Sequence, residues 1–484
     1  MAETQQLLIG GEWTDAASGE TFAVIDPWSG ETATLAAAAG REDAHRAVDA
    51  AAAAAPEWAD TPLAERRSML DRAADILMSR QAEIAGIVTA ETGGTFGWGM
   101  FNVDLAAGML RVAGAQAETL HDQAIESLIP GKRARAVRQP VGVVVGIAPW
   151  NAPVILGTRA VAAPLAYGNP VVLKASELSP ATHGQIVRAL TEAGIPAGVV
   201  NLITNAPDAA ADVVDELIAH PDVRRINFTG STRVGRLIAE NAGRHLKRVL
   251  LELGGKAPML VLDDADLDRA AAAANFGAFM HQGQICMSTE RLVVDRSVAG
   301  PLADKLAGRA RSLVVGDPHD PGTQIGPLVN RDAVRRVDEL VQDAVGKGAQ
   351  VLSGGRADGP AYVPTVLRGV TPQMRIYHEE SFGPVISIVE VEGEDEAVRV
   401  ANDTEYGLSS SVFTADARRG EAVARRLETG MCHINDTTVH DEPQMPFGGV
   451  KASGWGRFGG QAAAEEFTEL RWITVQDEPR EYPI

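Results

Sequence analysis

Residues 141–151 have the sequence Val-Gly-Val-Val-Val-Gly-Ile-Ala-Pro-Trp-Asn, an apolar run rich in valine that ends at a proline and an asparagine. Such a run is typical of a buried strand, and proline ends a strand because it lacks a backbone N–H. A helical segment follows Asn151, and residues 170–174 form a second strand-like run. Strand, helix and strand in this order predict two parallel strands joined by a helix.

The same alternation extends over most of the chain. After residue 174 we expect strands at 199–203 and 225–228 and helices at 179–193 and 231–242. A second series, from about 257 to 450, contains expected helices at 267–280, 298–312, 331–346 and 395–402. The sequence therefore predicts an α/β fold with two doubly wound, mostly parallel-sheet lobes, each covered by helices on both faces.

The segments that flank these lobes have other patterns. From about residue 42 to 110, apolar residues recur at spacings of three and four, which predicts packed amphipathic helices. In residues 118–140 arginines alternate with small and apolar residues, as expected of an extended ribbon. Residues 471–475 are strand-like, and a polar tail follows them.

The composition is that of a globular protein with an acidic surface. The 484 residues are 45% hydrophobic, and 64 acidic against 44 basic side chains give a net charge of -20. This charge disfavours nucleic acid and anionic membrane surfaces as partners. The chain has two cysteines, Cys286 and Cys432, and its N-terminal residues do not resemble a secretory signal, so we expect a reducing, cytoplasmic location.

One stretch, residues 139–158, has no charged side chain and is long enough to cross a bilayer. It contains Pro140, Pro149 and Pro153, which would leave backbone groups without partners in lipid. We therefore expect a buried strand, a loop and a helix start here, and no membrane span.

Two of the loops that follow apolar strands carry residues suited to ligand binding, because ligands meet the carboxyl edge of a parallel sheet. In the first loop Asn151 follows Trp150, and its amide could either end a turn or donate to a developing alkoxide. In the second loop Gly230 and Ser231 stand between a strand and a helix. This position suits either a plain turn or a phosphate at the helix N-terminus.

Two sequence matches to nucleotide-binding motifs fail on their context. Gly235 is followed by Arg236 and Leu237, where a Walker A loop has Lys and Ser or Thr. Residues 454–459 match GxGxxG, but a glycine-rich loop precedes them and too few residues follow for a βαβ unit. Neither motif is assigned a function.

Two further loops carry reactive groups. Glu252 ends an apolar run and precedes Leu-Gly-Gly-Lys, so it is either a solvated residue or a partly buried carboxylate suited to general-base work. Cys286 lies in the polar loop Gln-Gly-Gln-Ile-Cys-Met-Ser, where it is either an inert buried thiol or a nucleophile whose surroundings favour the thiolate. Cys286 and Cys432 show no metal-ligand spacing, so we expect no metal site.

Taken in order, these loops resemble the aldehyde dehydrogenase superfamily over nearly the whole chain. The matching strings are Pro149-Trp-Asn, Lys174–Glu177, Phe228-Thr-Gly-Ser-Thr, Glu252-Leu-Gly-Gly-Lys, Gly283-Gln-Ile-Cys, Glu380-Ser-Phe-Gly-Pro and Pro446-Phe-Gly-Gly. The resemblance implies a dinucleotide-binding domain over 1–117 and 141–252, a catalytic domain over 253–450, and an oligomerisation arm over 118–140 and 465–484. It also implies a homodimer or homotetramer joined through that arm.

The resemblance also implies roles for single residues. Cys286 would attack the aldehyde carbon to give a thiohemiacetal, and Asn151 with the Cys286 backbone N–H would stabilise its oxygen. Loss of hydride to NAD would leave a thioester, which Glu252 would hydrolyse by activating water.

For the cofactor, the resemblance implies contacts from several loops. Those to NAD are Trp150, Lys174, Glu177, Gly230, Ser231, Glu380 and Phe382. Because the Glu177 carboxylate would accept ribose hydroxyls and repel a 2'-phosphate, NAD is expected over NADP, with NADP use possible.

The segment 434–449, with its continuation to Gly460, resembles the bacterial vanillin, salicylaldehyde and benzaldehyde dehydrogenase branch, which oxidises aromatic aldehydes. Trp455 and Pro443 replace the Tyr and Ala expected in that branch. Arg159 also resembles the branch, and it would meet a ring hydroxyl or a carboxylate of the substrate, or else form a salt bridge at the surface or at an interface.

Three alternatives remain open at this point. An aliphatic semialdehyde dehydrogenase of the succinate-semialdehyde type would use the same chemistry, and Arg159 would bind the carboxylate of its substrate. Acyl transfer to coenzyme A is disfavoured by Glu252, which activates water. A catalytically silent protein is disfavoured by the intact set Cys286, Asn151 and Glu252.

Overall fold

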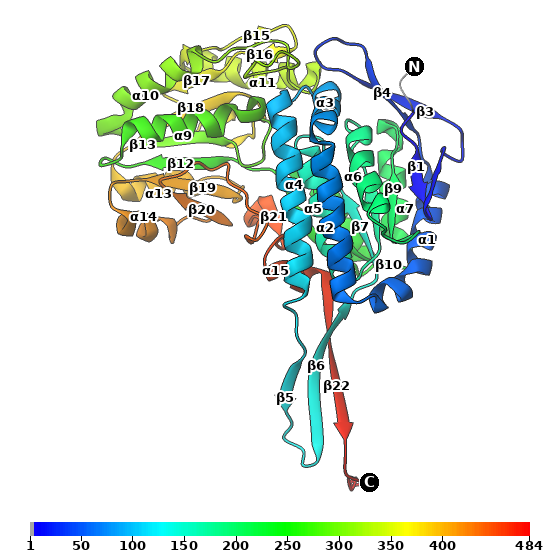
Figure 1. Ribbon diagram of the computed structural model, residues 1–484. Coiled ribbons are helices and arrows are strands. Elements are labelled where there is room, and N and C mark those ends of the chain that lie inside the picture. The colour runs from blue at the N-terminus through cyan, green and yellow to red at the C-terminus, as the bar shows by residue number, and fades with distance from the viewer. Residues whose placement is uncertain (1–3) are drawn as a thin grey trace.

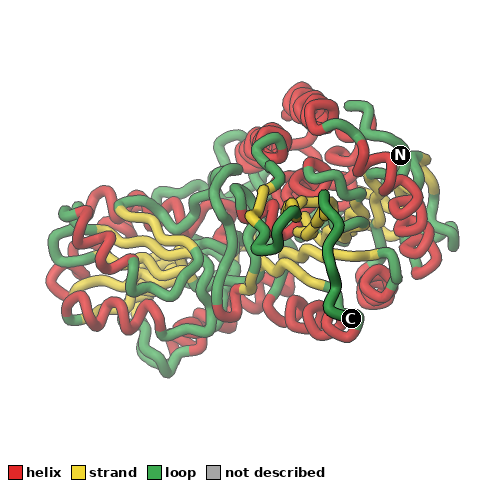
Figure 2. The backbone as a smooth tube through the Cα atoms, turned by 90° about the horizontal axis from the view of Figure 1, so that it is seen from below, coloured by secondary structure: helices red, strands yellow, loops and turns green. Residues whose placement is uncertain are grey.

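The computed structural model describes residues 4–484 and has two sheet-centred lobes and a projecting three-stranded arm (Figure 1). Seen from below, each lobe has its strands inside and its helices outside (Figure 2). The predicted fold class, two parallel-sheet α/β lobes with a small β arm, is confirmed.

The first sheet contains the strands predicted at the start of the alternating pattern. Its order is β2 (Glu12–Thr14), β1 (Leu7–Ile9), β9 (Val200–Ile203), β8 (Val171–Lys174), β7 (Val143–Ile147), β10 (Val223–Thr229), β11 (Arg248–Glu252) and β21 (Gly454–Trp455). The five central strands β9, β8, β7, β10 and β11 pair in parallel. Strand β1 pairs antiparallel with β9, β2 pairs antiparallel with β1, and β21 pairs antiparallel with β11. The GxGxxG match at 454–459 thus begins with a short edge strand.

Helices cover both faces of this sheet. One face packs on α1 (Arg41–Asp60), α7 (Ala210–Ala219) and α8 (Thr232–Arg244). The other packs on α5 (Pro153–Ala166) and α6 (Pro180–Glu192). A further layer of α2 (Leu63–Ser79), α3 (Gln81–Thr92) and α4 (Phe96–Ala117) packs on these two helices. The alternation of strand side chains explains why both faces need cover: Val143 and Val145 enter the first core, and Val144 enters the second.

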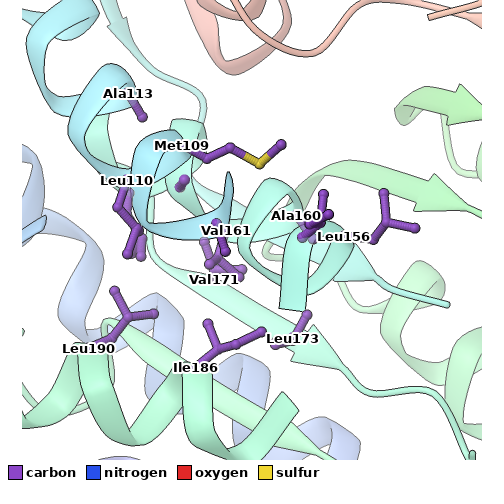
Figure 3. Close-up of a cluster of buried hydrophobic side chains, with 14 of the residues drawn as sticks. Met109, Leu110, Ala113, Leu156, Ala160, Val161, Val171, Leu173, Ile186 and Leu190 are labelled. Carbon is purple, nitrogen blue, oxygen red and sulfur yellow. The ribbon is translucent and has the colours of Figure 1, made fainter. Parts of the chain in front are cut away.

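Figure 3 shows the second core, between α4, α5, α6 and β8. Leu110 and Val161 are fully buried there with Ile186 and Leu190. The approach of α5 to the sheet needs a residue without a side chain, because a Cβ on Gly146 would lie 2.9 Å from the Cβ of Ala160. This packing fixes the N-terminus of α5, and with it the loop that carries Asn151.

The second sheet has the order β14 (Gln350–Ser353), β17 (Thr365–Arg368), β18 (Val385–Val391), β13 (Thr289–Asp295), β12 (Ala257–Val261), β19 (Ser409–Phe413) and β20 (Met431–Ile434). Strand β14 is antiparallel to β17, and the other strands pair in parallel. One face packs on α9 (Leu267–Phe279) and α10 (Arg296–Arg311), and the other on α11 (Arg331–Gly346), α13 (Gly393–Asn402) and α14 (Ala417–Ala424). The predicted helices therefore lie within a few residues of the observed ones.

The arm consists of β5 (Gln123–Glu126), β6 (Lys132–Pro140) and β22 (Thr468–Gln476). Strand β22 pairs with β6 from Thr468 opposite Pro140 to Gln476 opposite Lys132, so the C-terminal segment returns to the ribbon predicted at 118–140. The ribbon extends away from both lobes (Figure 1). Trp472 on β22 is 75% exposed and Leu470 is 57% exposed, which is unusual for apolar side chains on a strand.

Shorter elements complete the fold. They are the hairpins β3 (Thr21–Ile25) with β4 (Thr32–Ala37) and β15 (Ala357–Asp358) with β16 (Ala361–Tyr362), and the short helices α12 (Arg375–His378) and α15 (Ala462–Phe467). Within residues 4–484 no helix has both the length and the apolarity needed to cross a membrane. The uncharged stretch 139–158 forms the end of β6, then β7, a loop and the start of α5.

Candidate active site

The carboxyl ends of the parallel strands in the first sheet meet at one edge. Asn151 follows β7, Glu177 follows β8, Ser231 follows β10, and Glu252 is the last residue of β11. These residues are distant in sequence, and parallel pairing alone brings their loops together.

The loop that carries Cys286 comes from the second lobe and packs closely against this edge. It follows the 3₁₀ turn η2 (Met280–Gly283), in which His281 and Gln282 have positive φ angles of 48° and 56°. A Cβ on Gly255, just after β11, would lie 2.2 Å from the Cys286 carbonyl oxygen, and one on Gly283 would lie 2.1 Å from the Gly383 carbonyl oxygen. The two glycines therefore permit the contact that places the thiol beside Glu252.

Glu252 is a buried carboxylate without a hydrogen-bond partner. Its side chain is 1% exposed, and neither carboxylate oxygen is hydrogen-bonded within residues 4–484. Burial raises the pKa of Glu252 to about 7, and the nearby Arg159 guanidinium and Cys286 thiol lower it only in part. A carboxylate with this pKa can take a proton near neutral pH, as a general base must.

The surroundings of Cys286 differ from those expected from the sequence. Burial raises the pKa of the Cys286 thiol well above its usual range, and the neighbouring Glu252 carboxylate raises it further. No helix surrounds the residue, which lies in the loop between η2 and β13. The expectation that its surroundings favour the thiolate is therefore wrong, because burial and a nearby negative charge both favour the neutral thiol.

Asn151 is held with its amide facing the Cys286 loop. Its side-chain Nδ2 donates to the Gln284 carbonyl oxygen at 2.9 Å, and this leaves the second amide N–H free to donate. The Asn151 carbonyl oxygen accepts a hydrogen bond from Trp98 Nε1 at 3.1 Å, and the Trp98 indole stacks on the His281 ring with centroids 4.6 Å apart. Trp98 and His281 were not identified from the sequence, because neither lies in a motif.

Five of the predicted cofactor residues line one large cavity. This cavity of about 870 Å³ lies beside the carboxyl edge of the first sheet and is lined by Trp150, Lys174, Glu177, Gly230 and Ser231 among others. Ser231 caps α8 by accepting from the Val234 N–H, so the remaining N–H groups of this helix start are available to an anion. The cavity volume, the helix N-terminus and the Lys174–Glu177 ion pair fit a dinucleotide.

The other two predicted cofactor residues belong to the second lobe and do not line that cavity. The Phe382 ring meets the Trp150 indole edge-to-face, with centroids 5.8 Å apart. Glu380 accepts the Gly255 N–H at 2.9 Å, and burial raises its pKa to about 7. Phe382 thus adjoins the cavity wall at Trp150, and Glu380 lies against the loop after β11.

A buried ion pair that the sequence did not reveal positions these two residues. Lys256 pairs with Glu290, and both are almost fully buried. The Glu290 carboxylate also accepts the backbone N–H groups of Ser381 and Phe382, where Phe382 has a positive φ of 49°. Lys256 belongs to the Glu-Leu-Gly-Gly-Lys string, and its charge is the signal that could have prompted a search for a buried partner.

Arg159 lies in the wall of a second pocket, which contains Cys286 and Asn151. It forms an ion pair with Asp441, and its guanidinium lies 4.1 Å from the centroid of the Phe447 ring. Of the expected environments for Arg159, a surface salt bridge is excluded, because its side chain is 6% exposed. Asp441, which neutralises it, was not identified from the sequence.

The remaining lining of this pocket is almost entirely apolar. Four aromatic residues, Trp98, Phe101, Phe276 and Phe447, contribute to it together with aliphatic and methionine side chains. Aromatic side chains stack on or meet the edge of a planar ring, so the pocket suits a flat apolar molecule better than a flexible charged one.

One group of residues elsewhere has the spacing of a cation site. His45, Asp49 and His220 offer ligand atoms within 4.8 Å of one another. The His220 Nδ1 accepts the Asp222 N–H at 3.2 Å, so the neutral ring carries its hydrogen on Nε2, which faces Asp49. A nitrogen that carries a hydrogen cannot ligate a metal, and we assign no metal to this group.

The charge of Glu252 should control the reactivity of the Cys286 thiol. In Glu252→Gln, loss of the negative charge should lower the thiol pKa, so that the pH profile of Cys286 alkylation shifts to lower pH and alkylation at pH 8 becomes faster. Iodoacetamide labelling of Cys286 followed by peptide mass spectrometry measures this, with Cys432 as the internal reference. Slower alkylation would contradict the electrostatic account and would mean that Glu252 already removes the thiol proton in the resting protein.

Comparisons with known proteins agree with this geometry. The aldehyde dehydrogenase family model matches residues 13–473. A vanillin dehydrogenase from Pseudomonas sp. (strain HR199 / DSM 7063) is 55% identical over 478 residues and covers 99% of both chains. The crystal structure of a salicylaldehyde dehydrogenase from Pseudomonas putida G7 complexed with salicylaldehyde is 44% identical, with a TM-score of 0.97 and 99% of both chains covered.

A more distant structure, a betaine aldehyde dehydrogenase from Staphylococcus aureus in complex with NAD+, is 32% identical, with a TM-score of 0.95, and covers 99% of this chain and 96% of that chain. The chain therefore belongs to the aldehyde dehydrogenase family of NAD(P)-dependent oxidoreductases that act on aldehydes.

Proposed function

We propose that this protein oxidises an aromatic aldehyde to the carboxylic acid through a covalent intermediate on Cys286. The observation that carries the proposal is the meeting of the Cys286 thiol, the unpartnered Glu252 carboxylate and the Asn151 amide at an aromatic-lined pocket. Relatives named for vanillin, salicylaldehyde and benzaldehyde support the substrate class.

Cys286 is the proposed nucleophile. Because burial raises the pKa of the thiol, its proton must leave as sulfur attacks the aldehyde carbon, and the neighbouring Glu252 carboxylate, with a pKa of about 7, can accept it. Attack turns the aldehyde oxygen into an alkoxide within the thiohemiacetal. The free N–H of the Asn151 amide can donate to that oxygen, and removal of one such donor costs about 3 kcal/mol of transition-state stabilisation.

When bound, NAD(P) would supply the acceptor for a hydride. Loss of hydride from the thiohemiacetal carbon, which is already bonded to the Cys286 sulfur, would turn that carbon into the carbonyl of a thioester. Trp150 and Phe382 would hold the nicotinamide end in place, and Lys174 and Glu177 the adenosine end.

Glu252 is the proposed base for hydrolysis of the thioester. Glu252 must first release to solvent the proton that it took from the Cys286 thiol. Its ionised form then accepts a proton from water, the resulting hydroxide attacks the acyl carbon, and the Cys286 sulfur leaves and regains a proton from Glu252 as the acid forms. With a pKa of about 7, Glu252 is ionised above neutral pH, so the hydrolytic step should slow as the pH falls below that value.

Two alternatives are less well supported. A succinate-semialdehyde-type substrate would need a free cation for its carboxylate, but the Arg159 guanidinium is already paired with Asp441. The second carboxylate oxygen of Asp441 would repel such a substrate. Acyl transfer to coenzyme A would have no need of Glu252 as a base for water.

The experiment follows NAD reduction by purified protein with vanillin, salicylaldehyde, benzaldehyde and succinic semialdehyde. We expect higher kcat/KM for the aromatic aldehydes, and no turnover in Cys286→Ala. Cys432→Ala is the matched control, because its thiol lies in the second lobe outside the pocket and should be dispensable. A higher kcat/KM for succinic semialdehyde would overturn the substrate assignment and leave the covalent mechanism intact.

We also propose that Glu177 makes the enzyme prefer NAD. Its carboxylate pairs with Lys174 and accepts from Asn205 Nδ2 at 3.3 Å, so a 2'-phosphate at this place would meet a negative charge. In Glu177→Gln, which frees the Lys174 cation, the ratio of kcat/KM with NADP to that with NAD should rise about tenfold. Glu240→Gln, at the same cavity, should leave the ratio unchanged. An unchanged ratio in Glu177→Gln would refute the assignment.

The arm supports a further proposal, that the protein is a homodimer or homotetramer joined through β22. Its apolar residues Leu470 and Trp472 are exposed to solvent, and contact with a second copy of the chain would bury them. Trp472→Glu should reduce the sedimentation coefficient to that of a smaller species. Leu246→Glu is the control, since Leu246 is also exposed but lies at the end of α8. A wild-type monomer would refute the proposal.

A cytoplasmic location is likewise proposed, on the low cysteine content, and cell fractionation checks it.

A further inference from the structure

The Arg159–Asp441 pair forms part of the wall between two cavities. Both residues line the pocket that contains Cys286, and both also line a neighbouring cavity with Met109 and Gln116. The side chains are 6% and 10% exposed. A buried ion pair is costly to desolvate, so its position within an otherwise apolar wall needs a reason.

Arg159 is held on several sides. Asp441 Oδ2 accepts from its guanidinium, and the rings of Phe447 and Phe458 lie 4.1 Å and 5.8 Å from it. These contacts fix the guanidinium, and through it they fix the plane of the Asp441 carboxylate. Arg159 is therefore a positioning residue for Asp441.

The second oxygen of that carboxylate has no partner. Asp441 Oδ1 is buried and accepts no hydrogen bond within residues 4–484. An ionised carboxylate only accepts, so this oxygen calls for a donor from the molecule that fills the pocket. Of the other polar groups at the pocket, the Trp98 indole N–H donates to the Asn151 carbonyl oxygen, and the Asn151 amide donates to the Gln284 carbonyl oxygen. Glu252 also has unpartnered oxygens, but it neighbours the Cys286 thiol and does not line this pocket.

We propose that Asp441 accepts a hydrogen bond from a hydroxyl group on the ring of the aldehyde, and that it thereby makes hydroxylated benzaldehydes the preferred substrates. This inference rests on the proposed function. It changes the role expected for Arg159, which holds the acceptor and does not itself meet the substrate. The carboxylate takes the neutral phenol and repels the phenolate, so the protonation state of the substrate matters.

The test compares kcat/KM for benzaldehyde, the 2-, 3- and 4-hydroxybenzaldehydes and their methoxy counterparts. A methyl ether fills the same space but cannot donate. In Asp441→Asn the amide oxygen must face Arg159, because arginine only donates, and the NH2 group then faces the pocket in place of the acceptor. For at least one ring position, the ratio of kcat/KM for the hydroxybenzaldehyde to kcat/KM for its methoxy counterpart should fall about tenfold or more in this variant. The kcat/KM for benzaldehyde should change far less.

Glu442→Gln is the matched control. Glu442 is the next residue, lines the neighbouring cavity, and bonds to His440 and Gln444, so its loss of charge should leave the ratio unchanged. A second readout is the pH dependence in the wild type. KM for the preferred hydroxybenzaldehyde should rise as the pH passes the pKa of the substrate's own phenol, and KM for the methoxy compound should not.

If Asp441→Asn does not fold, the double variant Arg159→Met with Asp441→Leu replaces the pair by apolar side chains of similar size and should lose the same preference. Equal losses for all aldehydes would overturn the inference and mean that Asp441 only neutralises Arg159. A wild type that oxidises methoxy and hydroxy compounds equally well would overturn it while the proposed function stands. A wild type that oxidises no aromatic aldehyde would overturn both.

Discussion

The site depends on a close approach of backbone to backbone between the two lobes. Gly255 after β11 lies against the Cys286 carbonyl oxygen, at a separation that leaves no room for a Cβ. Within the second lobe, Gly283 lies equally close to the Gly383 carbonyl oxygen and so supports the loop that carries Cys286. Because no side chain separates these segments, the thiol from the second lobe reaches the carboxyl edge of the first sheet, where Glu252 ends β11. Asn151 is tied to the same place by its hydrogen bond to Gln284.

Burial has opposite consequences for paired and unpaired charges around this contact. The Lys256–Glu290 and Arg159–Asp441 ion pairs fix the Ser381–Phe382 turn and the wall of the aldehyde pocket. Glu252 has no such partner, and burial therefore raises its pKa to about 7. Burial thus gives rigid walls where charges are paired, and beside Cys286 it leaves Glu252 able to exchange a proton near neutral pH.

Cys286 shows how far local sequence can mislead about reactivity. Its polar neighbours in the chain suggested a stabilised thiolate, but the nearest charge in space is Glu252, which raises the thiol pKa. The interacting residues lie 34 positions apart, on strands or loops of different lobes. The Cys286 thiol therefore has to lose its proton, to Glu252, as it attacks the aldehyde. The two residues act together in this step.

The sequence by itself determined the alternating fold, most helices to within a few residues, and the strings that carry Asn151, Glu252 and Cys286. These features follow from local patterns, since strand and helix periodicities and glycine-rich turns are properties of neighbouring residues. Only the tertiary structure decided which charges pair. Glu290 and Trp98 lie in no motif, and Asp441 lies in the segment 434–449 without any sign of its partner. Each acquires its part in the site from a residue distant in the chain. A pKa, a buried ion pair or a free acceptor depends on distance and solvent exclusion, which a linear pattern does not contain.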